Sequence, residues 1–163
     1  MFAHYTFMGL HVNSSAHTVD LNPTVSIIRL MNSYDHKLFN LARAAARTST
    51  HSKARIGAVI ISGKSIISVG VNGKKGHPLQ QRYNKLRFDD ERANHLMHAE
   101  LDAIVKARAF IKDEPVIYIY RELRNGSPGM SRPCVGCLRA LHDHNIRKVF
   151  YTTEAGLAYE ELT

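Results

Sequence analysis

Residues 98–105 read HAELDAIV and residues 133–141 read PCVGCLRAL, and these two stretches decide the fold of the chain. In both, apolar side chains recur three and four positions apart, which is the spacing of one helix face. A short run rich in β-branched and aromatic residues follows each helix, at 116–120 and at 149–152. A helix that joins two neighbouring strands of one sheet makes those strands parallel. The sequence therefore predicts two helices crossing one face of a sheet that contains a parallel pair.

Antiparallel strands are predicted on both sides of this unit. The β-branched run at 56–61 and the apolar alternation at 66–71 are separated by Gly63-Lys64, a turn that favours a hairpin. At the C-terminal end, residues 157–162 follow a turn and predict a fifth strand, antiparallel to the one before it. We therefore expect an α/β fold, a three-layer-type α/β sandwich with a mixed five-stranded sheet.

The regular part of the chain is expected to begin near Tyr34, where a helix with Ser33 as its cap leads into the hairpin. Residues 1–33 show no persistent period and are interpreted as an N-terminal extension, irregular or partly helical. Residues 34–163 form the predicted domain, with a length typical of a single domain. The segment 72–94 is polar and rich in Gly, Lys and Arg, and a connection of that length in a small domain is usually functional.

Charge and composition limit the function only broadly. The chain carries 22 Lys and Arg against 14 Asp and Glu, a net charge of +8, which attracts free phosphates and polyanions alike. No apolar run reaches the roughly 18 residues that span a membrane, and the N-terminus lacks a secretory pattern. The two cysteines, Cys134 and Cys137, are too close in sequence for a disulfide to stabilise much. They indicate metal binding or redox chemistry in a reducing, cytoplasm-like compartment.

His98, Cys134 and Cys137 are the candidate metal ligands. Imidazole and thiolate groups are preferred ligands of Zn²⁺, and three of them leave the fourth tetrahedral position open, as in catalytic sites. The two cysteines stand three positions apart at a helix start, where their sulfurs share one face and the helix dipole favours thiolate. A closed structural site is the alternative, with His95 as a fourth ligand one turn before His98. We predict one zinc ion, and the sequence leaves open whether a second metal is bound.

Glu100 is the candidate proton carrier. It stands two residues after His98, an offset from which it cannot easily share the metal but can point at the open position. Zinc lowers the pKa of a water there to about 7. Glu100 could take a proton from that water and pass it to a leaving amine. A purely structural zinc site has no need for this carboxylate.

The order H-x-E at 98–100 followed by P-C-x-x-C at 133–137 resembles the cytidine and deoxycytidylate deaminase superfamily. The resemblance runs from Tyr34 to Thr163 and leaves residues 1–33 outside. It implies a zinc-dependent hydrolase that adds water to a cytosine ring and releases ammonia. The three metal ligands and the proton carrier have the same roles in that family.

The resemblance also implies residues that bind the substrate. The backbone N–H of Ala99 would contact the carbonyl of the base. The stretch VGVNG at 69–73 is similar to the strand-end motif of the family, whose Asn binds a sugar hydroxyl, and this places Asn72 in the site. The stretch RIGAV at 55–59 is similar to the first strand of the family.

The sequence leaves three functions open. The first is deamination of a free cytosine nucleotide, deoxycytidylate or a base-modified relative, to the uridylate. A phosphate needs Lys or Arg near the sugar, and Lys74, Arg55 and Arg121 are candidates. One feature departs from the deoxycytidylate branch: Val71 stands where those members usually have an aromatic residue.

The second function is deamination of a base within single-stranded DNA or RNA. Basic loops would form a channel for the backbone, and Tyr83, Phe88 and Tyr120 could stack on bases. The third is a non-catalytic zinc-containing interaction scaffold, against which Glu100 argues. The superfamily is commonly oligomeric, so the resemblance implies a homo-oligomer.

Overall fold

The computed structural model describes residues 31–51, 53–87 and 96–163. Nearly all of the predicted extension, residues 1–30, lies outside this part, as do Phe88 and His95. The helices and strands are, in chain order, α1 (Ser33–Arg47), β1 (Arg55–Ser62), β2 (Ser65–Val71), α2 (Pro78–Asn84), α3 (Ala99–Ala107), β3 (Val116–Glu122), β4 (Pro128–Gly129), α4 (Val135–Asp143), β5 (Lys148–Thr153) and β6 (Gly156–Glu161). No described helix has the length and apolar character that a membrane span requires.

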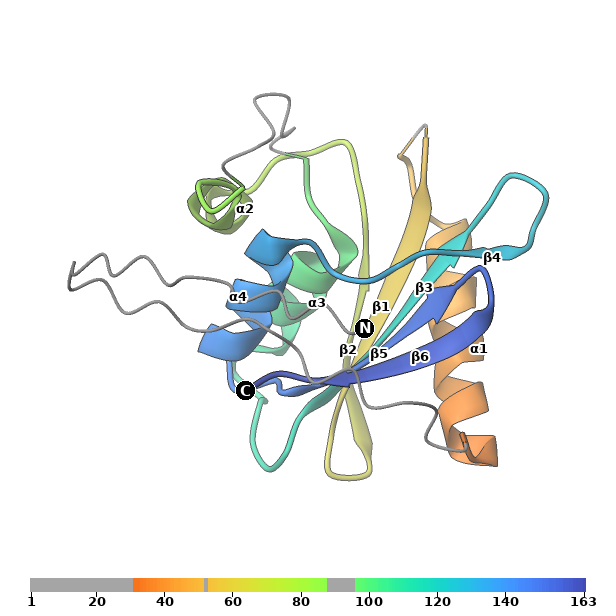
Figure 1. Ribbon diagram of the computed structural model, residues 1–163. Helices are drawn as coiled ribbons and strands as arrows, with labels where there is room; N and C mark the ends of the chain where they lie inside the picture. The colour runs from red at the N-terminus through yellow and green to blue at the C-terminus, as the bar shows by residue number, and fades with distance from the viewer. Residues whose placement is uncertain (1–30, 52, 88–95) are drawn as a thin grey trace, which may run out of the picture.

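The sheet has the predicted mixed topology. Its strand order is β2-β1-β3-β5-β6, with the short β4 beside β3 (Figure 1). The pair β3 and β5 is parallel, from Val116 opposite Lys148 to Ile119 opposite Tyr151. The hairpin β1–β2 and the pair β5–β6 are antiparallel. Both the fold class and the strand directions expected from the sequence are therefore confirmed.

Helices cover both faces of the sheet, which makes three layers. Helix α1 lies on one face, and α3 and α4 lie on the other (Figure 1). The core on the α1 face combines aliphatic side chains with aromatic rings, and the Tyr118 and Phe150 rings stack with centroids 4.7 Å apart. The α3 and α4 face is packed with small and aliphatic side chains. Because the two crossover helices share this second face, their N-termini come together at one end of it.

The N-terminal cap of α1 differs from the prediction. Asn32, not Ser33, caps the helix: its side chain accepts the backbone N–H groups of Tyr34 and Asp35. The Asp35 carboxylate accepts the backbone N–H of Asn32 in return, which completes a capping box. The buried Asp35 also accepts the hydroxyl of Tyr118 at 2.6 Å, so the cap is tied to the sheet. Asn is at least as good a cap as Ser, and only Asn32 has this reciprocal partner.

The described part of the segment 72–94, residues 72–87, is also more regular than predicted. Helix α2 begins where His77 accepts the backbone N–H of Leu79 and Pro78 takes the first helical position. The sequence interpretation treated this stretch as a polar loop because the helix is short and its apolar positions are few. Gln80, Tyr83 and Asn84 of α2 are buried, and this turns one side of the helix toward the α3 and α4 layer.

Glycine at position 70 lets α3 lie directly on the sheet. A Cβ atom at Gly70 would collide with the backbone oxygen of Ala99 and the backbone nitrogen of Ala103. Neither atom can move without shifting α3 and the residue that precedes it, His98. We expect Gly70→Ala to lower the free energy of unfolding by about 1–3 kcal/mol, the usual effect of overpacking. Urea unfolding measures this change.

Gly73→Ala is the matched control for that substitution, because the nearest heavy atom to its added Cβ would be the Thr50 hydroxyl at 3.8 Å. Its unfolding free energy should stay within about 0.5–1 kcal/mol of the parent. Equal stability of the Gly70→Ala variant and the parent would show that α3 does not sit as tightly on β2 as described.

Candidate metal centre and active-site pocket

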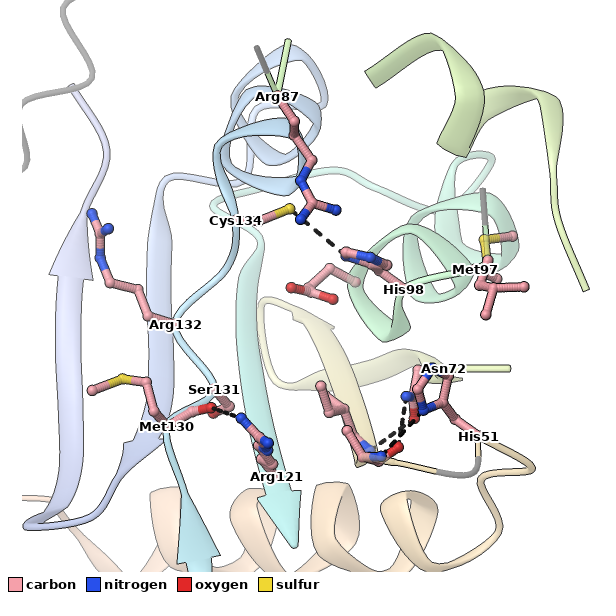
Figure 2. A pocket seen from close by; sticks show the side chains of 14 residues that line it. His51, Asn72, Arg87, Met97, His98, Arg121, Met130, Ser131, Arg132 and Cys134 are labelled. Carbon is pink, nitrogen blue, oxygen red and sulfur yellow. Dashed lines mark hydrogen bonds between the residues drawn. The ribbon is translucent and has the colours of Figure 1, made fainter. Parts of the chain in front are cut away.

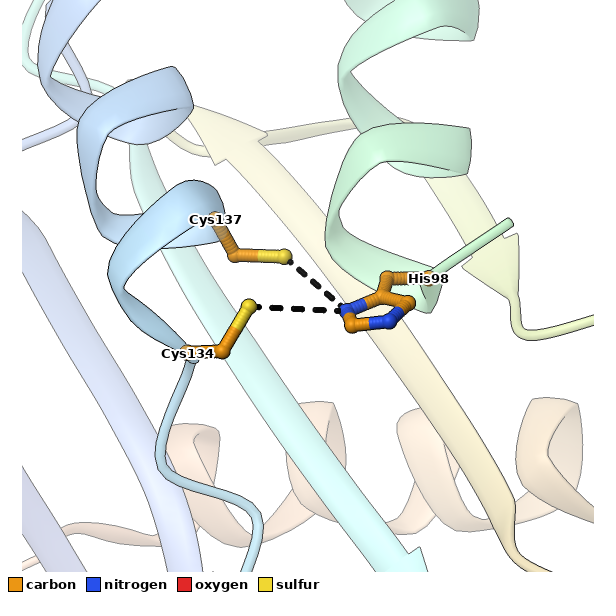
Figure 3. Close-up of side chains that lie close together, drawn as sticks. All are labelled: His98, Cys134 and Cys137. Carbon is orange, nitrogen blue, oxygen red and sulfur yellow. Dashed lines mark hydrogen bonds between the residues drawn. The ribbon is translucent and has the colours of Figure 1, made fainter. Parts of the chain in front are cut away.

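The candidate metal centre lies where α3 and α4 begin. His98 is the N-cap residue of α3 and Cys134 is the N-cap residue of α4. Neither side chain caps its own helix, so both are turned toward the space between the two helices (Figure 3). Cys137, one turn into α4, joins them. The two crossover connections thus bring His98 close to Cys134 and Cys137, although His98 and Cys137 are 39 positions apart in the sequence.

The spacing of the three side chains fits zinc. One ligand atom from each of them lies within 4.8 Å of the others. The His98 Nδ1 atom is 3.7 Å from Cys134 Sγ and 3.3 Å from Cys137 Sγ. A tetrahedral zinc at about 2.3 Å from sulfur and about 2.0 Å from nitrogen keeps those atoms about 3.5 Å apart. The donor set and its distances therefore suit zinc, with Nδ1 as the nitrogen that faces the metal.

Other histidines in the described residues have different roles. Nδ1 of His51 accepts the backbone N–H groups of Lys53 and Ala54, and Nδ1 of His77 accepts that of Leu79. The described residues contain one group of His, Cys, Asp or Glu side chains close enough to share a metal. His95, the predicted fourth ligand of a closed site, lies outside the described residues.

Thiol ionisation prepares the centre for a cation. A hydrogen bond from the Cys137 thiol, with further help from His98, lowers the pKa of Cys134 to about 4. Burial raises the pKa of the Cys137 thiol. Cys134 therefore ionises to a thiolate more readily than Cys137 does. The N-terminus of α4 adds a positive dipole end beside both.

Glu100 lies in the first turn of α3 and is only 5% exposed. Burial raises the pKa of its carboxyl group. It lines the same cavity as His98 and Cys134. A buried carboxyl group with a raised pKa, beside a candidate metal centre, is suited to accept and return a proton.

The cavity beside the candidate metal centre has a volume of about 340 Å³ (Figure 2). His98, Glu100 and Cys134 line one side of it, and Arg87 lines it as well. Asn72, Arg121 and Ser131 come from the ends of β2, β3 and the loop after β4. Its lining residues are His51, Ala54, Ile56, Asn72, Arg87, Leu96, Met97, His98, Glu100, Arg121, Met130, Ser131, Arg132 and Cys134.

The predicted substrate residues are not all brought to this cavity. Asn72 and Arg121 line it, and Ala99 is the fully buried first residue of α3. Arg55 instead lines a neighbouring cavity of about 400 Å³, which shares Arg121 with the first. Lys74 is exposed and lines neither cavity.

Asn72 is held firmly in place. Its Oδ1 atom accepts the backbone N–H of Ile56 at 2.8 Å and the Ser49 hydroxyl at 2.6 Å. Its Nδ2 atom donates to the backbone oxygen of Ala54 at 2.8 Å. The side chain therefore braces the loop between α1 and β1 against the end of β2. Only one amide hydrogen of Nδ2 is left for a ligand by these bonds.

Met130 and Ser131 line the cavity but were not predicted. The Ser131 hydroxyl lies 2.9 Å from that of Thr152 and donates to the backbone oxygen of Ile119 at 3.0 Å. These bonds fasten the segment before Cys134 to β3 and β5. In the sequence, the only signal was their position just before the P-C-x-x-C motif.

A family comparison agrees with this geometry. The model of the cytidine and deoxycytidylate deaminase zinc-binding region matches residues 32–153. The chain belongs to this family. Zinc is accordingly the metal of this family region, and His98, Cys134 and Cys137 form the candidate site for it. A sequence search among curated proteins finds no match.

Solved structures of deaminases share the fold. The cytidine deaminase from Burkholderia pseudomallei superposes with a TM-score of 0.56 at 17% identity, covering 80% of this chain and 93% of its own. The apo dCMP deaminase from the cyanophage S-TIM5 gives a TM-score of 0.53 at 18% identity, covering 76% of this chain and 86% of its own. At these identities the likeness shows the cytidine deaminase fold and leaves the substrate open.

Proposed function

We propose that this chain is a zinc-dependent hydrolytic deaminase of a cytosine-containing nucleotide, deoxycytidylate or a base-modified relative. Water replaces the exocyclic amine of the base, so that the products are the uridylate and ammonia. The observation that carries the proposal is the buried carboxyl group of Glu100 in one cavity with His98 and Cys134. A scaffold that used zinc only for structure would bury this carboxyl group at a cost and without a use.

The chain's own residues supply the rest of the chemistry. Bound zinc acts as a Lewis acid that activates water at neutral pH. Glu100 lines the cavity beside His98 and Cys134 and would carry two protons in turn from water, the first to the ring nitrogen and the second to the amine that leaves as ammonia. The first backbone N–H groups of α3, including that of Ala99, have no partner within the helix and can donate to the base carbonyl. The remaining amide hydrogen of Asn72 can donate to a sugar hydroxyl.

Cations beside the cavity favour a phosphate on the substrate. The neighbouring cavity is lined by Lys53, Arg55, Arg121 and Arg124 against one carboxylate, Glu122. That carboxylate is already paired with Arg43 and Arg47 of α1, and also with Arg55. The excess of positive charge at the junction of the two cavities suits a dianionic phosphate. The dCMP deaminase from the cyanophage S-TIM5, which shares the fold, has been solved in complex with dCMP and dUMP.

Deamination within single-stranded nucleic acid has less support. Two of the aromatic residues predicted to stack on bases, Tyr83 and Tyr120, are 4% and 8% exposed. They belong to the core, and stacking on a base needs an open ring face. Phe88 lies outside the described residues. The homo-oligomer, the cytoplasmic compartment and the boundary of the domain after residue 33 stay predictions of the sequence.

Ammonia release over a panel of cytosine compounds tests the function. The panel contains cytosine, cytidine and deoxycytidine, the mono- and triphosphates of the two nucleosides, and single-stranded DNA and RNA. We expect the highest kcat/KM with a monophosphate. Activity on oligonucleotides alone would contradict the proposal.

Arg121 is expected to distinguish nucleotides from nucleosides. It lines both cavities, and among the described residues its Nη1 atom donates to the backbone oxygen of Met130 at 3.4 Å. Arg121→Gln should raise the KM for deoxycytidylate by about 10–100-fold, because a hydrogen bond to a charged group contributes about 1.5–3 kcal/mol. The KM for deoxycytidine should change little. Steady-state kinetics on this substrate pair measures the difference.

Lys74→Gln is the matched control, since it removes one positive charge from a residue that lines neither cavity. It should leave both KM values within about twofold, as expected for an exposed charge screened by salt. An equal rise of the nucleotide KM in both variants would mean that general charge, not Arg121, recognises the phosphate.

A further inference from the structure

We propose that Gln80 is a positioning residue for the zinc ligand His98, and that α2 fixes the geometry of the metal centre through it. Gln80 is fully buried. Its Oε1 atom accepts the backbone N–H of His98 at 2.9 Å. Neither the sequence motif nor the family match assigns a role to this residue.

His98 needs such a partner because of its place in the chain. As the N-cap residue of α3 it stands outside the helix, and its imidazole faces the metal centre instead of capping. The residue before it, Met97, is held by a backbone hydrogen bond from its N–H to Lys75 at 3.0 Å. The Gln80 contact fixes the next peptide group, from which the His98 side chain projects. Partners of this kind orient a ligand and tune its affinity for the metal.

The amide of Gln80 is itself oriented. Its Nε2 atom donates to Oδ1 of Asn84 at 2.8 Å, one turn further along α2. Because the nitrogen is used there, the oxygen must face His98, where it meets a donor. Of the two possible flips of the Gln80 amide, only this one satisfies both partners. Both polar atoms of this buried amide therefore have a hydrogen-bond partner.

Helix α2 holds the cysteine side of the centre as well. Gly136 lies between the two cysteines, and a Cβ atom there would be 2.7 Å from the backbone oxygen of Tyr83. The Tyr83 hydroxyl donates to Asp143 at the other end of α4, at 3.0 Å. One short helix therefore contacts both helices that carry ligands, one through Gln80 and the other through Tyr83. The distance between His98 and the cysteines depends on α2.

Zinc release tests this inference without any substrate, so its outcome is independent of whether the chain deaminates nucleotides. The chain is loaded with one equivalent of zinc, and release to a colorimetric chelator is followed in time. Gln80→Leu, which removes the acceptor in a similar volume, should speed release by about 10–100-fold. Gln80→Glu keeps an acceptor oxygen for His98 but loses the donor to Asn84, and it should release zinc more slowly than Gln80→Leu does.

Gln81→Leu is the matched control, because this neighbour on the same helix is exposed. It should release zinc at the parent rate. Gln80→Met provides a second apolar replacement with a flexible side chain, in case the leucine variant does not fold. Absorption spectra of the cobalt-substituted proteins report the geometry of the ligands directly, and should shift for Gln80→Leu and Gln80→Met only.

Two results would overturn the inference. One is parent-like zinc release and cobalt spectra in a folded Gln80→Leu or Gln80→Met variant. The other is equally fast release from Gln80→Glu and Gln80→Leu, since the acceptor oxygen would then be irrelevant. Thermal unfolding of the metal-free variants separates a general loss of stability from an effect on the metal.

Discussion

Glu100→Gln is expected to lower kcat by about 10²–10⁴-fold, the usual contribution of a positioned acid–base group, and to leave one zinc per chain. The amide has nearly the same shape and still forms hydrogen bonds, but it cannot accept the proton from water. The side chain is buried beside the ligands without being one of the three, so the metal should remain. Ammonia release measures the rate, and elemental analysis measures the zinc.

Glu154→Gln is the matched control for this prediction, because Glu154 is an exposed glutamate in the turn between β5 and β6. Its kcat should equal that of the parent. Full activity of the Glu100→Gln variant would refute the assignment of the proton carrier. Loss of zinc in that variant would show that Glu100 also contributes to the metal centre.

Cys137→Ser is expected to lose both zinc and activity. Substitution of a residue that only orients a metal ligand costs about 10–100-fold in metal affinity, so removal of a thiolate ligand should cost more than about 100-fold. Cys137 is fully buried and its sulfur lies 3.3 Å from His98 Nδ1, so no water or neighbouring side chain can easily replace it. Competition with a chelator of known affinity measures the change.

His142→Gln controls for substitutions in α4, because His142 lies toward the far end of the same helix. It should bind zinc as the parent does. Parent-like zinc affinity of the Cys137→Ser variant would place the metal elsewhere. Retained activity in that variant after chelation would show that the reaction does not require zinc.

The metal centre could be predicted from sequence because its ligands lie in two short sequence motifs. Each ligand stands at or near a helix start, and the strands on either side set the crossover topology that brings the helices together. The H-x-E spacing likewise places Glu100 in the first turn of α3, where the structure has it. The roles of these residues stay predictions until activity is measured.

The surroundings of the centre could not be predicted in the same way. Gln80 lies in a stretch of polar sequence with no hydrophobic period, and only its contact with His98 reveals its position. Tyr83 and Tyr120 looked suited to base stacking because a sequence does not tell a core aromatic from an exposed one. Lys74 follows Asn72 by two residues, yet the chain turns and leaves this cation outside both cavities.

Ammonia release from deoxycytidylate as a function of bound zinc is the most direct test of the account. Zinc is removed from the chain by chelation and then returned in steps up to one equivalent. We expect no ammonia release from the metal-free chain. The rate of release should rise in proportion to the bound zinc and reach its maximum at one ion per chain. A rate that does not depend on zinc would contradict the account, as would a fully loaded chain that releases no ammonia from any cytosine nucleotide.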